Sequence, residues 1–297
     1  MTPMATSIGV GLKRIVFGTD FSAVAECAAT YAKGVALRFS ASVDVVHVFD
    51  TDVYLDDAEP RLQTLDDRLA VRSEKLEDLA KTFVAKGLRT KTELPVVRPS
   101  WSGLLKAAEA EKADLIVVAT RSKAQLKRVF VGSTVEELIR QAPQPVLTVG
   151  PRVAAAADGP VEFRRIVYAT DFSPEAEKAA QAALLFAEHG AANIYVCHVI
   201  DCRANPEEAA AERNVRENEV RENLERLMAA SPLGAYGCEL EIAYGAPAES
   251  ILALAAKVKA DLIVMGPRKH SFWLTHVKRG VTLEVLAQAT CPVLTVH

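Results

Sequence analysis

The feature that most constrains the fold of this chain is a stretch of sequence that occurs twice. The letters RIVFGTDFS begin at Arg14, and the closely similar RIVYATDFS begins at Arg165, 151 positions later. Further along, the spacing between matching letters becomes 147, as in the DLIV runs that begin at Asp114 and Asp261. Both copies end in PVLTV. A period this long indicates a duplicated domain, because the units of a solenoid have about 20 to 50 residues.

Two domains also fit the length of 297 residues, since a domain typically has about 150. We predict one domain over 1–150 and a second over 160–297. The segment GPRVAAAADGP between them is rich in small residues and bounded by prolines. It is interpreted as a linker that only routes the chain from one domain to the next.

Composition argues against several functional classes. The net charge is −3, without the basic stripe of a nucleic-acid-binding protein. No apolar run approaches the ~20 residues of a membrane span, and MTPMATSIGVGLKR carries its charges after the apolar letters, unlike a secretory signal.

The five cysteines show no disulfide framework, and CHVIDC lacks zinc-finger spacing, so Cys197 is interpreted as a buried strand residue. We expect a cytoplasmic protein with no metal, membrane or nucleic-acid partner.

Each half alternates apolar, β-rich runs with helical patterns. In the first half the expected strands are 14–19, 41–49, 90–97, 114–120 and 145–149, and the expected helices are 22–39, 62–83, 102–112 and 133–142. The second half repeats this order, with a charged helix through 206–229. Alternating strands and helices with continuous apolar strands predict an α/β fold, with a doubly wound parallel sheet in each half.

The repeated TDFS letters follow the first strand of each half. In a doubly wound sheet a ligand lies beyond the carboxyl ends of the strands, so this turn would face the binding crevice. A structural role competes with this one, because Ser22 and Ser173 suit the N-cap of the next helix and Pro174 suits its first position. Asp20 and Asp171 could act in either role.

Several motifs together resemble the universal stress protein family. They are TDFS, HV at the end of the second strand, a G-x-P-x-x-x-I turn from Gly245 to Ile251, DLIVMG, and the PVLTV endings. The resemblance covers nearly the whole chain as two tandem domains. It implies a Rossmann-like, adenine nucleotide alpha hydrolase-like fold with a five-stranded sheet in each domain. It also implies a regulatory role in the stress response without established catalysis.

Members of this family divide into those that bind ATP and those that do not. The binding members carry G-x-x-G, nine residues, then G-[ST] after the fourth strand, where glycines let the backbone approach phosphates at a helix N-terminus. The first half keeps this spacing with small residues, so the resemblance implies an ATP or ADP site there. Its candidate binding residues are Thr19, Asp20 and Val48 for adenosine, and Ala119, Ser122, Gly132, Ser133 and Thr134 for the phosphates.

Two observations compete with a nucleotide site in the first half. A methyl group at Ala119 would close the approach to phosphates. Ser133 and Glu136 also form a Ser-x-x-Glu capping box, which gives the serine a role without nucleotide.

The second half departs further from the motif. Gly266 is kept, but Lys269 and Arg279 stand at glycine positions and Gly280 stands where Ser or Thr belongs. Two long side chains remove the room that backbone donors need. We interpret KHSFWLTHVKR as a solvated or partner-contacting loop, in which Phe272 and Trp273 pack against a neighbouring surface.

Two classes of function remain, and the sequence carries no hydrolase or kinase signature. The first is an adenine-nucleotide-responsive stress regulator, and the second is a nucleotide-independent scaffold or interaction protein with degenerate sites. Slow ATP hydrolysis is a third option, for which no residue is identified as the base. The acidic residues between Asp50 and Glu59 lack the spacing of a calcium loop.

The PVLTV endings predict how the halves meet. Each would be an edge strand with unpaired backbone groups, and pairing them removes both edges. We expect an intramolecular pseudo-dimer with these strands antiparallel at its centre, the alternative being beads on a string. Val146, Thr148, Val293 and Thr295 would share one face, and Leu147, Val149, Leu294 and Val296 the other. Unknown protein partners and a further homodimer stay open.

Overall fold

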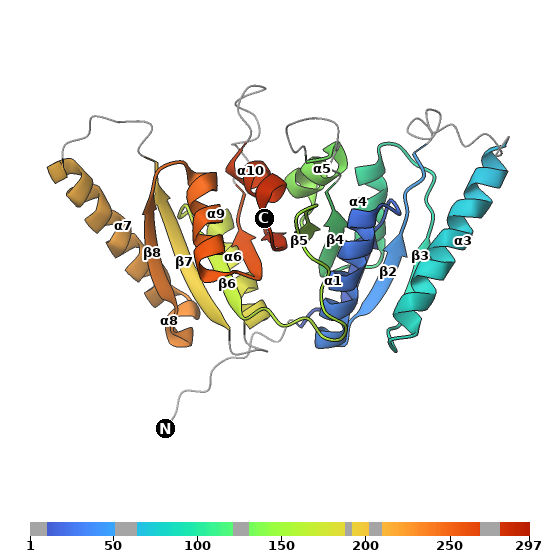
Figure 1. The fold of residues 1–297 in the computed structure, drawn as a ribbon, viewed down its shortest axis with the longest axis horizontal. Helices are drawn as coiled ribbons and strands as arrows, with labels where there is room; N and C mark the ends of the chain where they lie inside the picture. The colour runs from blue at the N-terminus through green and yellow to red at the C-terminus, as the bar shows by residue number, and fades with distance from the viewer. Residues whose placement is uncertain (1–10, 51–63, 121–130, 188–191, 202–209, 268–279) are drawn as a thin grey trace.

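The computed structural model describes residues 11–50, 64–120, 131–187, 192–201, 210–267 and 280–297 (Figure 1). Within these residues each half forms five strands that are parallel to one another. In the first half the strands are β1 (Arg14–Gly18), β2 (Ser42–Val46), β3 (Thr90–Glu93), β4 (Leu115–Ala119) and β5 (Val146–Val149). In the second half they are β6 (Arg165–Ala169), β7 (Asn193–Ile200), β8 (Glu239–Tyr244), β9 (Leu262–Met265) and β10 (Val293–Thr295). The predicted α/β fold is confirmed.

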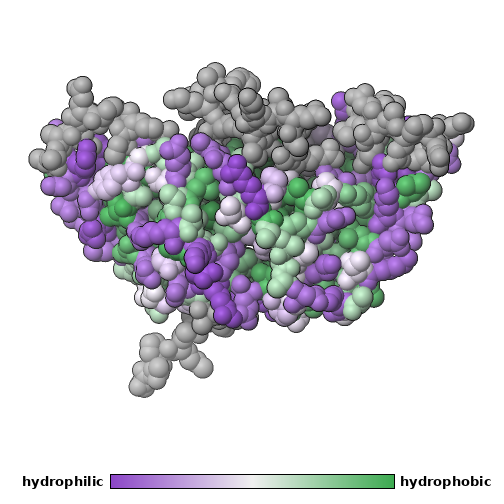
Figure 2. All heavy atoms as spheres, in the orientation of Figure 1, coloured by the Kyte–Doolittle hydropathy of each residue, from purple (hydrophilic) through white to green (hydrophobic). Residues whose placement is uncertain are grey.

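Helices cover both faces of the strands. One face packs against α1 (Ala23–Phe39), α3 (Leu65–Val84), α6 (Pro174–Ala187), α7 (Ala210–Ala230) and α8 (Leu233–Tyr236). The other packs against α4 (Ser100–Ala110), α5 (Ser133–Gln141), α9 (Pro247–Val258) and α10 (Val281–Gln288). Burial on both faces explains why strands such as β4 read as continuous apolar runs. Hydrophilic residues gather over the outer helices at the two ends of the face shown in Figure 2.

The two sheets join into one ten-stranded sheet with the order β3-β2-β1-β4-β5-β10-β9-β6-β7-β8. At its centre β5 and β10 are antiparallel, with Leu147 opposite Leu294, which confirms the predicted pairing. Leu147 and Leu294 lie in the core cluster under α1 and α6, and Val146 and Val293 in the cluster under α4 and α9. The predicted division of the two faces is therefore also confirmed.

The segment between the halves is packed along α1, so the prediction that it only routes the chain is wrong. The Cys27 thiol donates to the Val153 carbonyl at 3.3 Å, and the Tyr31 hydroxyl to the Ala154 carbonyl at 3.0 Å. The Thr30 hydroxyl accepts the Ala156 N–H at 2.8 Å. These α1 residues follow a 3,4 spacing, which places them on one face of the helix. We call residues 150–164 the strap.

The strap continues past α1 to the second half. The Val161 N–H donates to the Gly34 carbonyl at 3.0 Å, and Val161 packs so closely that a Cβ at Gly34 would lie 2.2 Å from its Cγ2. Arg38 donates to the carbonyls of Val161 at 3.2 Å and Phe186 at 2.6 Å. Arg38 thus ties α1 to the last turn of α6 in the second half.

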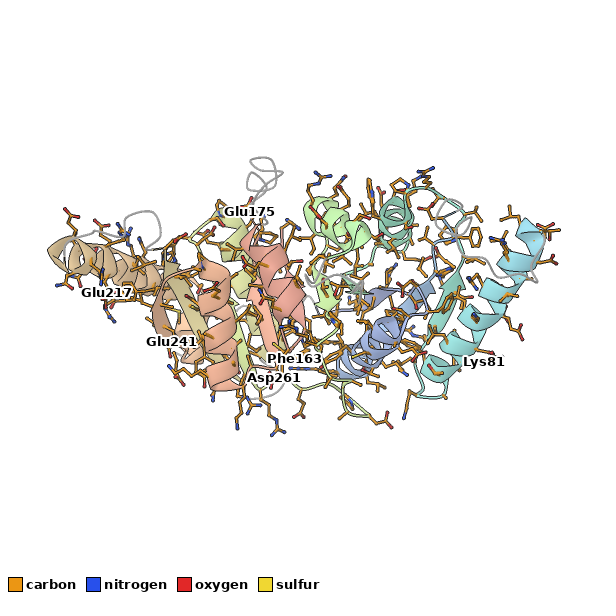
Figure 3. The ribbon with its side chains drawn as sticks, turned by 45° about the horizontal axis from the view of Figure 1, so that its top comes forward. Lys81, Phe163, Glu175, Glu217, Glu241 and Asp261 are labelled. Carbon is orange, nitrogen blue, oxygen red and sulfur yellow. The ribbon has the colours of Figure 1, made fainter. Side chains whose placement is uncertain are left out.

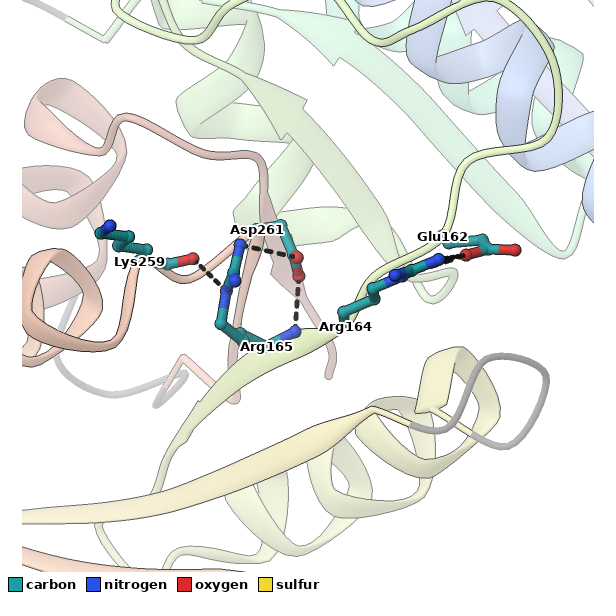
Figure 4. Close-up of polar contacts among 5 residues, drawn as sticks. All are labelled: Glu162, Arg164, Arg165, Lys259 and Asp261. Atoms are coloured by element: carbon teal, nitrogen blue, oxygen red, sulfur yellow. Dashed lines mark hydrogen bonds and ion pairs between the residues drawn. The ribbon is translucent and has the colours of Figure 1, made fainter.

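An arginine and an aspartate close the amino end of each sheet. The Arg165 N–H donates to Asp261 Oδ1 at 2.9 Å, and its guanidinium donates to the Lys259 carbonyl at 2.7 Å (Figure 4). In the first half the Arg14 N–H donates to Asp114 Oδ2 at 2.9 Å. The repeated Arg and Asp letters therefore hold the fourth strand of each half beside the first.

Candidate functional site

The TDFS turn is built in the same way in both halves. In the first, Thr19 Oγ1 accepts the Phe21 N–H at 3.0 Å, Asp20 Oδ1 accepts the Ser22 N–H at 3.0 Å, and Ser22 Oγ accepts the Ala25 N–H at 3.2 Å. The same three bonds in the second half measure 3.1, 3.1 and 3.3 Å. Ser22 is the N-cap of α1, as predicted. The aspartates orient this turn as well, so TDFS recurs in part because each half needs the same turn.

A histidine at the end of the second strand of each half supports the turn, and His47 is buried whereas His198 is half-buried. His47 Nδ1 donates to the Thr19 carbonyl at 2.8 Å, and its ring centroid lies 4.5 Å from that of Phe21. His198 makes the matching bond to Thr170 at 2.9 Å and stacks on Phe172 at the same 4.5 Å. These two histidines were not among the candidate site residues predicted from the sequence. The signal was present, because each follows its TDFS turn at the same distance.

Val48 presents its backbone to the end of β1. The carbonyl of Val46 accepts the Thr19 N–H at 2.9 Å, whereas the His47 N–H donates to Glu93 on the other side. Because successive residues of a strand alternate in direction, the Val48 N–H and carbonyl point toward β1. Neither has a backbone partner among the described residues. The Val48 side chain is fixed against α4, where a Cβ on Gly103 would lie 2.8 Å from it.

The amino end of α5 carries no side-chain cap, and this corrects the predicted capping box. Gly132 is the N-cap, and Ser133 is the first helical residue, so the Ser133 side chain does not occupy the capping position. The Glu136 N–H donates to the Gly132 carbonyl at 3.0 Å. Among the residues that the structure describes, no side chain caps the first N–H groups of α5, and uncapped N–H groups at a helix N-terminus are suited to binding anions.

Helix α10 also starts after a glycine N-cap, Gly280, without a side-chain cap hydrogen bond. The C-caps Ala142 and Ala289 keep the spacing of 147, and at this spacing Gly280 stands at the position of Ser133, as predicted. The helix has 8 residues against 9 in α5, so it starts one residue later in the second half.

Ala119 ends β4 and Gly266 directly follows β9, and the two residues differ in their surroundings. A Cβ on Gly266 would lie 2.2 Å from the Glu175 carbonyl oxygen at the start of α6, so this position has no room for a methyl group. Ala119 packs with the cluster under α1, on the opposite face from the α5 residues Val135 and Leu138. The Ala119 methyl therefore points away from the helix that would meet phosphates.

The described candidate residues lie on one edge of the first sheet. Thr19 and Asp20 follow β1, Val48 follows β2, Ala119 ends β4, and Gly132–Thr134 open α5. Ser122 lies outside the described residues, as do Lys269, Arg279, Phe272 and Trp273 of the second half. Most of the acidic loop also lies outside, and its first residue, Asp50, accepts the Ser100 hydroxyl at 3.2 Å. No cluster of three or more metal-ligating side chains occurs in the part of the chain that the structure describes.

Comparison with known proteins identifies the family. The sequence model of the universal stress protein family matches residues 11–150 and 162–297. The chain belongs to the universal stress protein family. Each half is thus a universal stress protein domain, and none of the helices in the described ranges is long and apolar enough to cross a membrane.

Relatives with one such domain match about half of the chain. A universal stress protein of Methanocaldococcus jannaschii is 34% identical over 139 residues, which are 46% of this chain and 81% of that protein. A universal stress protein of Thermus aquaticus is 33% identical over 138 residues, 46% of this chain and 98% of that protein.

A solved structure matches both halves of the chain together. The crystal structure of a universal stress protein from Archaeoglobus fulgidus has a TM-score of 0.66 at 20% identity and covers 95% of this chain and 97% of its own. The fold of the complete tandem is therefore shared with that universal stress protein.

Proposed function

We propose that this universal stress protein is a stress-response regulator that binds ATP or ADP through its first half. The observation that carries the proposal is the amino end of α5, which has no side-chain cap and lies on the same sheet edge as Asp20 and Val48. An uncapped helix N-terminus favours phosphate, because its N–H groups and dipole both complement negative charge.

Each candidate residue has a distinct part in this proposal. The N–H groups of Ser133 and Thr134, with Gly132 giving close access, would donate to phosphate oxygens. The Val48 N–H and carbonyl, which point toward β1, suit the donor and acceptor edge of adenine. Asp20 is held in position by the Ser22 N–H and would contact the ribose. The proposal assigns no general base to any of these groups, so we propose regulation by binding rather than by turnover.

The second half supports the proposal less well. Its α10 has the same uncapped start, but Lys269 and Arg279 stand at glycine positions of the motif. Gly266, the glycine that fits the motif, is required by the packing of α6. We therefore propose one site for each chain, in the first half. The described cysteines are free thiols, in keeping with action in a reducing cytoplasm.

A nucleotide-independent scaffold is the second candidate function. It is favoured by the continuous ten-stranded sheet, which makes the tandem one extended body whether or not a ligand is bound. In that case the surfaces of the outer strands and helices would carry the function.

Whether the purified protein carries bound nucleotide distinguishes the nucleotide-binding regulator from the scaffold. We expect protein purified without added nucleotide to show the absorbance ratio of a nucleotide complex and to release ATP or ADP on denaturation. Calorimetry on the stripped protein should then give one site for each chain, and Gly132→Val should weaken it at least tenfold, about 1.4 kcal/mol. Stripped protein that binds neither ATP nor ADP would leave the scaffold as the function.

A further inference from the structure

Both backbone groups of Thr19 are held by the end of the second strand. The Thr19 N–H donates to the Val46 carbonyl at 2.9 Å, and the Thr19 carbonyl accepts a hydrogen bond from His47 Nδ1 at 2.8 Å. Because a carbonyl oxygen only accepts, Nδ1 carries the proton in this bond. The His47 N–H donates to the Glu93 carbonyl at 3.0 Å. His47 therefore joins β1, β2 and β3 at the edge where all three end.

The turn after Thr19 needs such support. Phe21 has a φ of 60°, in the left-handed region, which is costly for a residue with a bulky side chain. The Thr19 hydroxyl accepts the Phe21 N–H, and the His47 ring centroid lies 4.5 Å from that of Phe21. Asp20 lies between these two held residues, so its direction depends on the contacts of His47.

His47 also fixes the backbone of the residue that follows it. Val48 directs its N–H and carbonyl toward the end of β1, and His47 is bonded to Thr19 on one side and to Glu93 on the other. One side chain thus sets the spacing between Asp20 and the Val48 backbone, the groups proposed to contact ribose and adenine. His47 itself is 1% exposed, so it supports these groups from behind and does not contact a ligand.

We propose that His47 is a positioning residue for the nucleotide site of the first half, holding Asp20 and the Val48 backbone in the geometry that binds adenosine. This inference rests on the proposed function of that half. Fixed groups behind the binding residues strengthen binding, because fewer degrees of freedom are then lost when the ligand is bound.

His198 provides a matched control in the second half, where we propose no nucleotide site. It bonds to the Thr170 carbonyl at 2.9 Å and stacks on Phe172, whose φ is also 60°. Figure 3 shows Glu175, two residues beyond this turn, and Asp261 at opposite ends of the second half, so the turn lies at the carboxyl ends of its strands as in the first half. Loss of the His198 bond should destabilise the protein but leave nucleotide binding unchanged.

Leucine and asparagine separate the hydrogen bond from the size of the side chain. The two have nearly the same shape, and only asparagine can donate to the Thr19 carbonyl. We expect His47→Leu to weaken ATP binding to the stripped full chain about tenfold in calorimetry, and His47→Asn to bind within about threefold of the wild type. His198→Leu should bind ATP as the wild type does, and urea unfolding shows whether each variant is folded.

The preference for ATP over GTP is a readout that a loss of stability alone does not change. The Val48 N–H and carbonyl suit the acceptor and donor of adenine, whereas guanine presents an acceptor where adenine presents a donor. We expect this preference to fall in His47→Leu and to be kept in His47→Asn. If His47→Leu does not fold, His47→Gln replaces it, since its amide lies farther from the main chain than Nδ1.

Weaker ATP binding and a reduced preference for ATP, both confined to the variant that lacks the donor, support the proposal. Wild-type affinity in His47→Leu overturns the positioning role and leaves the proposed function in place. The same holds for equal losses in His47→Leu and His198→Leu, for equal losses in His47→Leu and His47→Asn, and for a loss without a change in preference. Wild-type protein that binds no ATP overturns both proposals.

Discussion

The first and second halves carry the same turn at the same sheet edge, yet the end of the fourth strand is packed differently in the two halves. At the end of β9 the absence of a side chain on Gly266 is required by the backbone of Glu175 at the start of α6. At the end of β4 an alanine is accommodated, and its methyl group faces α1 rather than α5. A glycine that fits a nucleotide motif can therefore be explained by packing, and an alanine that departs from the motif can still leave the phosphate side open.

The helices after the two turns differ in a second way. Helix α1 has Gly34 beneath the strap, whereas the matching position of α6 is Leu185. The face of α1 that holds the strap consists of small and hydrogen-bonding residues. Duplication gave both halves the same fold, but only one of these helices is shaped to hold the connection between them.

We expect the largest effect on stability at the end of β9, where the packing of Gly266 leaves no room for a methyl group. Gly266→Ala places a methyl group against backbone atoms of α6, which cannot move aside as a side chain can. We expect a loss of about 3 kcal/mol in the free energy of unfolding, the upper range for overpacking a core. The matched control is Ala119→Gly, which we expect to cost about 1 kcal/mol. Equal costs in urea unfolding would show that the two strand ends are packed alike.

The next effect concerns the strap. Gly34→Ala brings a Cβ to 2.2 Å from Val161 Cγ2 and 3.1 Å from the Gly159 carbonyl oxygen, so we expect a cost of about 2 kcal/mol. In a Val161→Ala background the clash with the valine is removed, and the alanine should be close to neutral, since alanine favours helix over glycine. A cost of Gly34→Ala that is the same in both backgrounds would show that the strap is not held there.

A smaller effect distinguishes β2 from β7. Asp44 is 3% exposed in β2, and the matching residue in β7 is Tyr195. Burial raises the pKa of Asp44, and the nearby Glu111 raises it further, against the lowering influence of Lys91.

The sign of this effect follows from the raised pKa. The folded protein binds this proton more tightly than the unfolded chain, so the charged carboxylate destabilises the fold above the folded-state pKa. We expect Asp44→Asn to raise the free energy of unfolding at pH 7. This gain should shrink as the pH falls through the folded-state pKa toward the unfolded value. A gain that does not change between pH 7 and pH 4 would contradict this explanation.

Much of the architecture could be predicted from local pattern. Continuous apolar strands separated by helices fix the parallel sheets, and strict alternation in PVLTV assigns Leu147 and Leu294 to one face. The antiparallel pairing of β5 and β10 followed from the need to cover two edges. These inferences depend on the periodicity of apolar residues, which can be read from the sequence. They also depend on the general requirement that backbone groups form hydrogen bonds.

The missed features depend on contacts between distant residues or on choices between similar residues. The requirement for Gly266 comes from Glu175, far away in the sequence. The strap looks like a linker because its small residues fit closely on α1, and only the 3,4 spacing of Cys27, Thr30, Tyr31 and Gly34 could have indicated it. The N-cap of α5 is Gly132 and not Ser133 as predicted, because both residues are acceptable N-caps.

The central claim is that one half binds adenine nucleotide and the other does not, and a matched pair of substitutions tests it most directly. Gly132 and Gly280 are N-caps with nearly the same extended backbone, φ −66° and −62°, which valine adopts without strain. We would measure ATP binding to the stripped full-length protein, Gly132→Val and Gly280→Val by calorimetry. The account predicts one site for each chain, weakened at least tenfold by Gly132→Val and unchanged by Gly280→Val. Two sites for each chain, or a single site lost only in Gly280→Val, would contradict it.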